Sequence, residues 1–328
     1  MNKLLLFLFS KSLITFGMVL AIGYSTACLF LFAAQGKFIF FPTRAIETTP
    51  LDFQLGYQDV VLPIPTKTGP AETVHGWWIP ALDTPPSPGR ARGHRPYNRG
   101  EAKNSVPVPP LNKGGLGLNK GGLGGVVLYL HGNALNVGAN VEHANRFHRL
   151  GLSVFLIDYR GYGKSQGDFP SESRVYEDAQ LAWDYLVKQR GIKPSQIYIY
   201  GHSLGGAIAI DLAVRHPEAA GLIVEGSFTS ARAMVDFQAG VYRVFPIDLL
   251  LTQRFDSIAK VDRLQMPVLF IHGSADTVVP TQMSKKLFDA APEPKQLYIV
   301  PDGNHNNSAQ IGGAEYLLRV RQFLDISK

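Results

Sequence analysis

The pentapeptide at residues 201–205, which reads GHSLG, is the clearest chemical signal in the sequence. It matches G-x-S-x-G, in which glycines permit a tight turn that exposes the serine hydroxyl. The preceding run 197–200 is typical of a strand, and residues 206–210 suit a helix. A strand, a sharp turn and a helix N-terminus project the serine oxygen and favour negative charge beside it. We therefore predict that Ser203 is a catalytic nucleophile, against the alternative of a structural glycine-rich turn.

A serine hydroxyl becomes a strong nucleophile only when a base removes its proton, so a histidine should follow along the chain. Of the nine histidines, His216, His272 and His305 lie beyond Ser203. His216 falls at a helix end and His272 inside a predicted strand. His305 lies in the turn-rich sequence DGNHN after the last predicted strand. We predict His305 as the base; the alternative is a surface loop histidine.

An acid should hold the ring of this histidine in the correct tautomer. Asp276 follows the predicted strand 267–271 and stands between the serine and the histidine in chain order, as expected. Two rivals exist. Asp302 is three residues from His305 and more simply shapes its turn, while Glu225 ends the preceding strand. We predict Asp276 as the acid.

Two backbone N–H groups should stabilise the oxyanion of a tetrahedral intermediate. Leu204, the residue after the nucleophile, supplies one of them. The other should come from the loop after the predicted strand 126–130, where Asn133 is the simplest donor and Ala134 its neighbour. This chemistry needs no metal and no cofactor, and we predict neither.

Short apolar runs alternate with helix-period stretches along most of the chain, which is typical of a mainly parallel sheet covered on both faces. The first two strands follow one another without a helix, as an antiparallel edge would. Residues 228–262 form a longer excursion that we interpret as a small cap. The predicted strands are 57–62, 73–79, 126–130, 153–159, 196–200, 221–225, 267–272 and 296–300. The predicted helices lie near 140–150, 174–190, 204–215, 281–291 and 313–325.

The N-terminal segment 1–36 is expected to be a transmembrane anchor. Residues 12–36 carry no charge and are dominated by aliphatic and aromatic side chains, and roughly 20 such residues span a bilayer. The alternative is a cleaved signal segment ending at small residues such as Ser25 and Ala27, but apolar character continues beyond them. We expect a single-pass membrane protein with its catalytic domain, 37–328, on the non-cytoplasmic side.

Residues 83–125 stand out by composition. They hold seven Pro and ten Gly and a tandem LNKGGLG repeat, so we interpret them as a disordered low-complexity insertion in the catalytic domain. Seven basic and two acidic residues lie there, which accounts for five of the six net positive charges. The basic balance therefore belongs to one segment and does not indicate nucleic-acid binding.

Several short motifs resemble the α/β-hydrolase superfamily, in particular its membrane-anchored members related to serine aminopeptidases and monoacylglycerol lipases. They are FPTR at 41–44, GWW at 76–78, HGNA at 131–134, DYRGYG at 158–163, GHSLGG at 201–206, and the loops of Asp276 and His305. These pieces span nearly the whole chain in order, and the insertion at 83–125 is the departure. The resemblance implies the α/β-hydrolase fold and hydrolysis of an ester, a thioester or an amide.

Three function classes remain in view. The first is a carboxylesterase, lipase or thioesterase-like serine hydrolase that acts on a small acyl substrate, with lipids among the candidates. The second is an aminopeptidase-like amidase, which would need an acidic pocket for the substrate amine; Glu225 and Asp236 are the candidates. The third is a non-enzymatic protein of this fold, which the complete set of catalytic residues disfavours.

Overall fold

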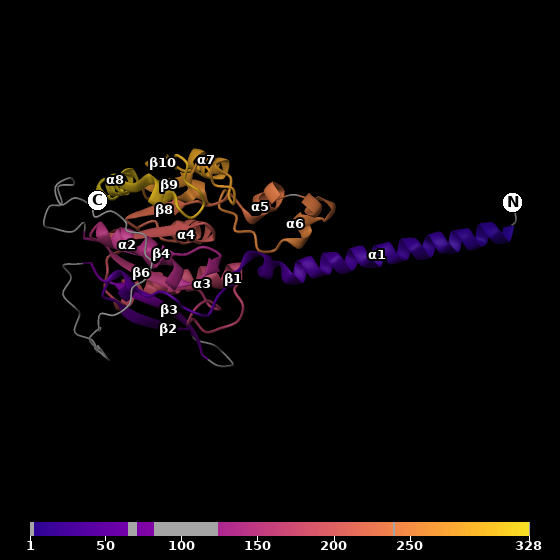
Figure 1. Ribbon diagram of the computed structural model, residues 1–328, viewed down its shortest axis with the longest axis horizontal. Coiled ribbons are helices and arrows are strands. Elements are labelled where there is room, and N and C mark those ends of the chain that lie inside the picture. Colours follow the sequence, from indigo (N-terminus) through magenta and orange to yellow (C-terminus); the bar gives the residue numbers. More distant parts are fainter. Residues whose placement is uncertain (1–2, 65–70, 82–123, 239, 328) are drawn as a thin grey trace.

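Eight strands form one sheet at the centre of the computed structural model (Figure 1). The structure describes residues 3–64, 71–81, 124–238 and 240–327. The strands of this sheet are β2 (Gln58–Ile64), β3 (Glu72–Ile79), β4 (Val126–Leu130), β6 (Ser153–Asp158), β7 (Ile197–His202), β8 (Gly221–Glu225), β9 (Val268–Gly273) and β10 (Lys295–Val300). Their order is β10-β9-β8-β7-β4-β6-β3-β2. All eight strands were predicted, with bounds that differ by at most two residues.

β3 runs opposite to the other seven strands, since it is antiparallel to both β2 and β6. The pairs from β6 through β4, β7, β8 and β9 to β10 are all parallel. The predicted mainly parallel sheet with an antiparallel edge is therefore confirmed. Because parallel strands end at one edge, the loops after β4, β7, β9 and β10 meet there, and this edge carries the site.

Helices cover both faces of the sheet. They are α2 (Val141–Arg149), α3 (Glu172–Asp184), α4 (Leu204–Arg215), α7 (Thr281–Ala290) and α8 (Ser308–Ile326). One core contains side chains of α3, α4 and α7, and the other contains side chains of α2 and α8. Alternate residues of β4 enter the two cores: Leu128 and Leu130 the first, Val127 and Tyr129 the second. Burial on both faces explains the continuous apolar runs.

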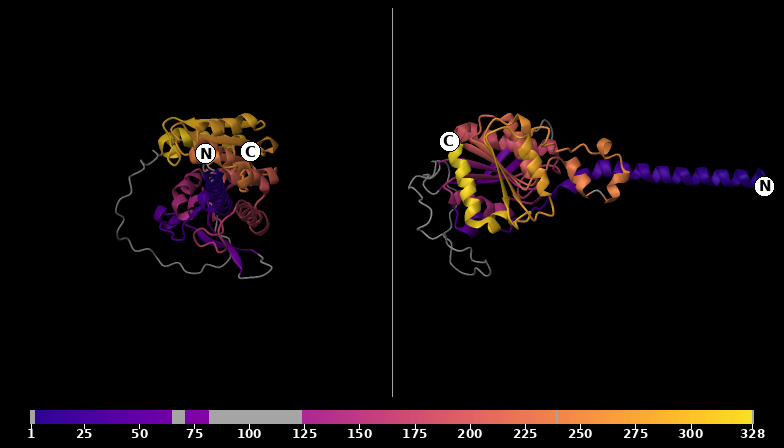
Figure 2. Two further views of the ribbon diagram at one scale, coloured as in Figure 1. Left: turned by 90° about the vertical axis from the view of Figure 1, so that its right-hand side faces the viewer. Right: turned by 90° about the horizontal axis from the view of Figure 1, so that it is seen from above.

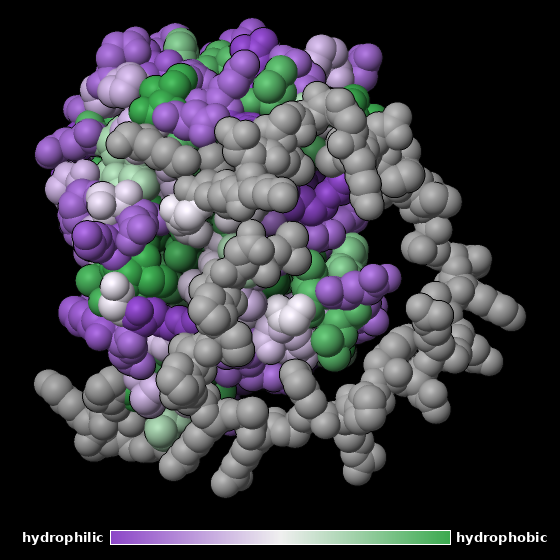
Figure 3. Space-filling view, turned by 90° about the vertical axis from the view of Figure 1, so that its left-hand side faces the viewer, coloured by the Kyte–Doolittle hydropathy of each residue, from purple (hydrophilic) through white to green (hydrophobic). Residues whose placement is uncertain are grey.

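The N-terminal helix α1 (Lys3–Ile39) projects away from the sheet as a long rod (Figures 1 and 2). Its segment Ser10–Ile39 is long and apolar enough to cross a membrane, with a mean hydropathy of 1.9, and it is not buried within the structure. By length and composition, this N-terminal helix suggests a membrane anchor or a signal sequence. At the opposite end of the domain, hydrophilic side chains are interspersed with small hydrophobic areas (Figure 3).

The predicted cap at 228–262 leaves the sheet after β8 and lies beside the base of α1 (Figure 1). It contains the helices α5 (Ala231–Gln238) and α6 (Ile247–Leu250) and a 3-10 turn at Gly240–Val244. A small parallel pair, β1 (Phe41–Pro42) with β5 (Ala134–Leu135), joins the end of α1 to the loop after β4. The predicted insertion at 83–125 lies outside the described residues except for Gly124 and Gly125.

Candidate active site

Ser203 occupies the sharp turn between β7 and α4. Its backbone has φ 54° and ψ −120°, a left-handed conformation that costs energy for any residue with a Cβ. Its N–H donates to the Glu225 carbonyl at 2.8 Å, which fixes the turn against β8. The residue is 8% exposed and lines a cavity. This strained strand–turn–helix geometry is the one that the motif predicted.

Glycines surround the turn because no side chain fits at these positions. A Cβ on Gly201 would lie 2.1 Å from the Gly205 carbonyl oxygen, and one on Gly205 would lie 2.0 Å from the Leu130 carbonyl oxygen. Both separations are far shorter than any van der Waals contact. The glycines of the motif therefore allow α4 to pack directly against β4 and β7.

Gly205→Ala should lower the free energy of unfolding by about 3 kcal/mol, since the new methyl group forces buried backbone apart. Gly56→Ala is the matched control: nothing lies within 4 Å of its added Cβ, so a change within about 0.5 kcal/mol is expected there. Chemical denaturation of the purified full chain in detergent measures both. A Gly205→Ala protein as stable as the control would contradict this packing argument.

The structure brings Ser203, His305 and Asp276 together from three separate loops. His305 Nε2 lies 3.0 Å from Ser203 Oγ, and His305 Nδ1 lies 2.7 Å from Asp276 Oδ2. The Asp276 side chain is fully buried, and that of His305 is 10% exposed. One ring nitrogen of the histidine therefore faces the hydroxyl and the other faces the carboxylate.

Asp276 is held by more partners than His305 alone. Its Oδ1 accepts from the Val278 and Val279 backbone N–H groups at 2.8 and 2.9 Å, and His272 Nε2 lies 3.2 Å from its Oδ2. Burial by itself would raise the pKa of this carboxyl, but hydrogen bonds from His272, His305 and Val279 outweigh it and hold the pKa well below its usual range. Asp276 is therefore ionised at neutral pH.

His272 is a site residue that the sequence reasoning treated only as part of a strand. Its Nε2–H donates to the Val279 carbonyl at 2.9 Å, and its Nδ1 accepts from the Ser284 hydroxyl at 2.6 Å. The carbonyl can only accept, so it fixes Nε2 as the protonated nitrogen beside Asp276.

His202 is a second residue that the sequence reasoning missed, although it occupies the x position before the serine. Its Nε2–H donates to the His305 carbonyl at 2.9 Å. Burial and the neighbouring His305 lower the pKa of its imidazole, so the ring is neutral at neutral pH. It therefore holds the loop of the predicted base in place without adding charge.

The two rival acids do not reach the His305 ring. The Glu225 carboxylate is buried and accepts from the hydroxyls of Tyr200 and Tyr316 at 2.8 and 2.6 Å. Asp302 is exposed, and its backbone N–H donates to the Ser274 hydroxyl, as a turn residue would. The described residues contain no group of three or more His, Cys, Asp or Glu side chains that could hold a metal.

The two predicted oxyanion donors belong to residues that line the same cavity as Ser203. Leu204 is the first residue of α4, and Asn133 lies in the loop after β4. The Asn133 carbonyl accepts from the Phe41 N–H at 2.8 Å and from the Tyr162 hydroxyl at 2.7 Å, and its side chain donates to the Ile39 carbonyl at 3.0 Å. The neighbouring candidate Ala134 begins β5 (Ala134–Leu135). Asn133 is thus tied to the end of α1.

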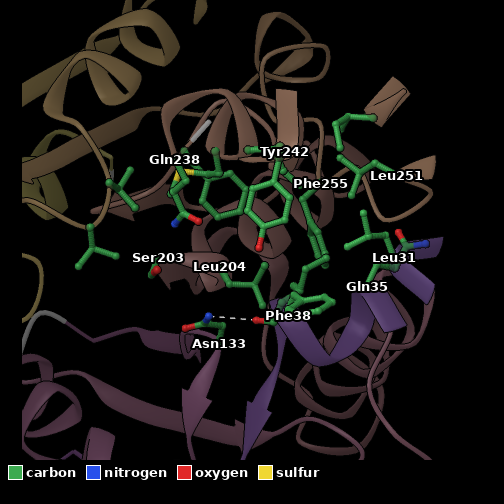
Figure 4. A pocket seen from close by; sticks show the side chains of 18 of the residues that line it. Leu31, Gln35, Phe38, Asn133, Ser203, Leu204, Gln238, Tyr242, Leu251 and Phe255 are labelled. Atoms are coloured by element: carbon green, nitrogen blue, oxygen red, sulfur yellow. Dashed lines mark hydrogen bonds between the residues drawn. The ribbon is translucent and has the colours of Figure 1, made fainter. Parts of the chain in front are cut away.

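The cavity has a volume of about 250 Å³ and extends from Ser203 to the cap and α1 (Figure 4). None of the described residues that line it is charged. The walls come from α1, from the loops around Ser203 and from the cap. The lining residues are Leu31, Gln35, Phe38, Ile39, Asn133, Ser203, Leu204, Phe228, Ala231, Met234, Val235, Gln238, Tyr242, Ile247, Leu250, Leu251, Phe255, Val278 and Val279.

Comparison with protein families matches residues 123–257 and 250–308 to the family described as serine aminopeptidase, S33. An uncharacterized protein of Mycobacterium tuberculosis is 40% identical over 204 residues, which cover 62% of this chain and 71% of that protein. The α/β-hydrolase domain-containing protein 17B of Homo sapiens is 34% identical over 202 residues, covering 60% and 65%. Protein bem46 of Schizosaccharomyces pombe is 35% identical over 209 residues, covering 60% and 66%.

Solved structures share the fold. The Pyrococcus furiosus esterase Pf2001 superposes with a TM-score of 0.61 at 18% identity, covering 88% of this chain and 97% of that one. An α/β hydrolase of Vibrio vulnificus gives a TM-score of 0.56 at 23% identity, with 81% of each chain covered. The chain is therefore a hydrolase that belongs to the serine aminopeptidase S33 family of the α/β-hydrolase superfamily.

Proposed function

We propose that this protein is a serine acyl hydrolase that cleaves esters or thioesters through an acyl-enzyme on Ser203. The observation that carries the proposal is the line of contacts from Ser203 Oγ through the His305 ring to Asp276, at 3.0 and 2.7 Å, at one side of an apolar cavity. Nucleophile, base and orienting acid are thus within hydrogen-bond reach of one another.

In the first half of the reaction, the Ser203 hydroxyl donates to His305 Nε2, which takes the proton as the oxygen attacks the acyl carbon. The Asp276 carboxylate accepts from His305 Nδ1–H, so it fixes the tautomer and stabilises the imidazolium that forms. The N–H groups of Leu204 and Asn133 donate to the oxyanion, aided by the N-terminus of α4. His305 then protonates the leaving alcohol or thiol.

The second half repeats these roles with water as the nucleophile. His305 removes a proton from the water molecule, which attacks the acyl-enzyme, and the acid is released when Ser203 regains its proton. His272 and His202 act by position: the first supports Asp276, and the second holds the backbone of His305. Every proton transfer passes through His305.

The lining of the cavity favours an acyl substrate over an aminopeptidase substrate. Recognition of a free amine requires a carboxylate in the pocket, and none of the described lining residues is acidic. Glu225 is committed to two tyrosine hydroxyls, and Asp236 pairs with Arg232 on the outside of the cap. A screen of the full chain against esters, thioesters and aminoacyl amides of graded chain length tests this. Faster cleavage of aminoacyl amides than of esters would overturn it.

The N-terminal helix is best explained as a retained anchor, because it is built into the catalytic domain. The Tyr24 hydroxyl donates to the Val244 carbonyl at 2.9 Å, and the ring stacks on Phe245. The Gln35 side chain accepts from the backbone N–H groups of Thr252 and Gln253 at 2.9 and 3.0 Å. A signal sequence removed near Ala27 would take the first of these contacts with it.

We expect the mature protein to retain its N-terminus and to stay in the membrane pellet after alkaline washing. Lys3 and Lys11 precede the span and Lys37 and Arg44 follow it, so the distribution of charge decides orientation only weakly. Protease treatment of spheroplasts should digest the catalytic domain if it lies on the non-cytoplasmic side. A mature N-terminus at or near Cys28 would contradict the anchor.

A further inference from the structure

The anchor helix forms one wall of the cavity that holds Ser203. Leu31, Gln35, Phe38 and Ile39 of α1 all line it. At 1.5 Å per residue, the cavity follows α1 for about 12 Å. In Figure 4, Ser203 lies at one side of the cavity, and Leu31 and Leu251 lie at the other. The end remote from the nucleophile is therefore bounded by the helix that would cross the membrane and by the cap.

The uncharged stretch between Lys11 and Lys37 fixes how deep this end lies. It comprises residues 12–36, and roughly 20 residues cross the hydrocarbon core of a bilayer. Every window of 20 residues within 12–36 includes residues 17–31. Any span placed within 12–36 therefore puts Tyr24 and Leu31 at hydrocarbon depth. Because Leu31 lines the cavity, the remote end of the cavity also lies at that depth.

The cap reaches the same depth, because it contacts α1 at Tyr24. Its 3-10 turn receives the Tyr24 hydrogen bond at Val244, and its surface exposes apolar side chains: Phe237 is 51%, Val244 64% and Leu249 79% exposed. These side chains suit contact with lipid better than contact with water.

The cap also carries polar and charged groups that a bilayer would have to accommodate. Arg232 pairs with both Asp236 and Asp248, so its positive charge offsets one of these two carboxylates. Gln35, on the α1 side of the cavity, has both ends of its amide satisfied: Oε1 accepts from Thr252 and Gln253, and Nε2 donates to Phe32 and Leu250 carbonyls. Arg243 is exposed, so immersion of the cap requires its long side chain to extend toward the lipid headgroups.

We propose that α1 and the cap form an entrance within the membrane, through which the acyl chain of a long-chain ester or thioester passes from the bilayer to Ser203. The inference rests on the proposed function. It adds that the substrate comes from the bilayer and that the anchor helix forms part of its path. Three features support this proposal: the remote end of the cavity lies at hydrocarbon depth, the cavity lining is apolar, and Ser203 lies at the other side of the cavity. The anchor helix then determines specificity as well as location.

The test uses the full chain reconstituted in phosphatidylcholine vesicles. Leu31→Trp places a bulky ring at the remote end of the cavity. Leu29→Trp is the matched control, because Leu29 is 67% exposed and lies two residues away, on the opposite side of the helix. The substrates are p-nitrophenyl palmitate dissolved in the vesicles and p-nitrophenyl acetate in water. Labelling of Ser203 by a fluorophosphonate shows which protein molecules are folded.

Leu31→Trp should lower the ratio of kcat/KM for palmitate to that for acetate by about tenfold or more, because the palmitoyl chain loses its space. Leu29→Trp should leave this ratio as in the unsubstituted protein. An unchanged ratio in Leu31→Trp would overturn the entrance. A second outcome concerns the unsubstituted protein, provided that its Ser203 is labelled and that it cleaves p-nitrophenyl acetate. If it then cleaves p-nitrophenyl palmitate no faster from vesicles than from a detergent-free suspension, direct uptake from the bilayer is contradicted.

A second measurement tests depth without relying on activity. Leu249→Trp on the cap should be quenched by lipids brominated on their acyl chains, whereas Ile326→Trp at the end of α8, 60% exposed and far from α1, should not. Equal quenching, or none at either site, would overturn the immersed cap. If the unsubstituted protein is not labelled at Ser203 and cleaves neither ester, the proposed hydrolase function itself is contradicted. Failure of the hydrolase proposal can therefore be distinguished from failure of the entrance proposal.

Discussion

Ser203→Ala should lower kcat by about 10⁴ to 10⁶ and abolish labelling by a fluorophosphonate, because the attacking oxygen is removed while the fold is retained. Alanine can adopt the same φ of 54° at the same cost as serine, and the turn is held by backbone contacts such as the Ser203 N–H to the Glu225 carbonyl. The loss is therefore expected in the chemical step and not in stability. Hydrolysis of p-nitrophenyl acetate and thermal unfolding measure the two separately.

Ser173→Ala provides the control for this experiment. Ser173 is an exposed residue in the first turn of α3, and its hydroxyl hydrogen-bonds to the Ser171 hydroxyl at 3.3 Å. Activity and labelling should match those of the unsubstituted protein. Labelling that persists in Ser203→Ala would show that another serine is the nucleophile and would remove the proposed mechanism.

The fold could be predicted from the sequence because local patterns carry most of it. The strand bounds follow from apolar runs: β4 and β8 begin and end where the pattern predicted, since both are buried on each face. The nucleophile turn could be predicted for a similar reason. Its glycines, the strand before it and the helix after it are all adjacent in the chain, so the motif of residues 201–205 contains its own structural context.

The contacts of His272 with Asp276 could not be predicted in the same way, because they depend on how one loop curves. A strand residue four positions before an acid usually points elsewhere. Here Asp276 accepts from the N–H groups of Val278 and Val279, which turns the loop back toward the His272 ring. Hydropathy and spacing carry no information about that curvature.

The role of α1 in the cavity is also invisible in the sequence. Its apolar character predicts a membrane span, but an apolar helix has no feature that distinguishes a side facing lipid from a side facing a pocket. The contact of Gln35 with Thr252 and Gln253 joins residues more than 200 positions apart. Such a pairing follows from the position of the cap, which only the three-dimensional structure gives.

Asp276→Asn should lower kcat by about 10⁴, far more than Asp302→Asn or Glu225→Gln. The asparagine would keep the side chain's shape, but its Nδ2–H₂ group would donate toward His305 Nδ1. That nitrogen would then have to accept, so the proton would move to Nε2, and Nε2 could no longer take the proton of Ser203. The lost negative charge would also leave the imidazolium without its stabilising partner.

The two comparison variants make this result specific to position. Asp302 is an exposed turn residue, and Glu225 contacts Tyr200 and Tyr316 and not the His305 ring, so Asp302→Asn and Glu225→Gln leave the line of contacts to Ser203 intact. Steady-state hydrolysis and the rate of fluorophosphonate labelling should both fall in Asp276→Asn, because both need the hydroxyl proton removed. Equal losses in all three variants would show that the acid has been misassigned. A loss confined to Asp276→Asn identifies the carboxylate whose low pKa keeps it ionised, and therefore able to orient the base, throughout the neutral pH range.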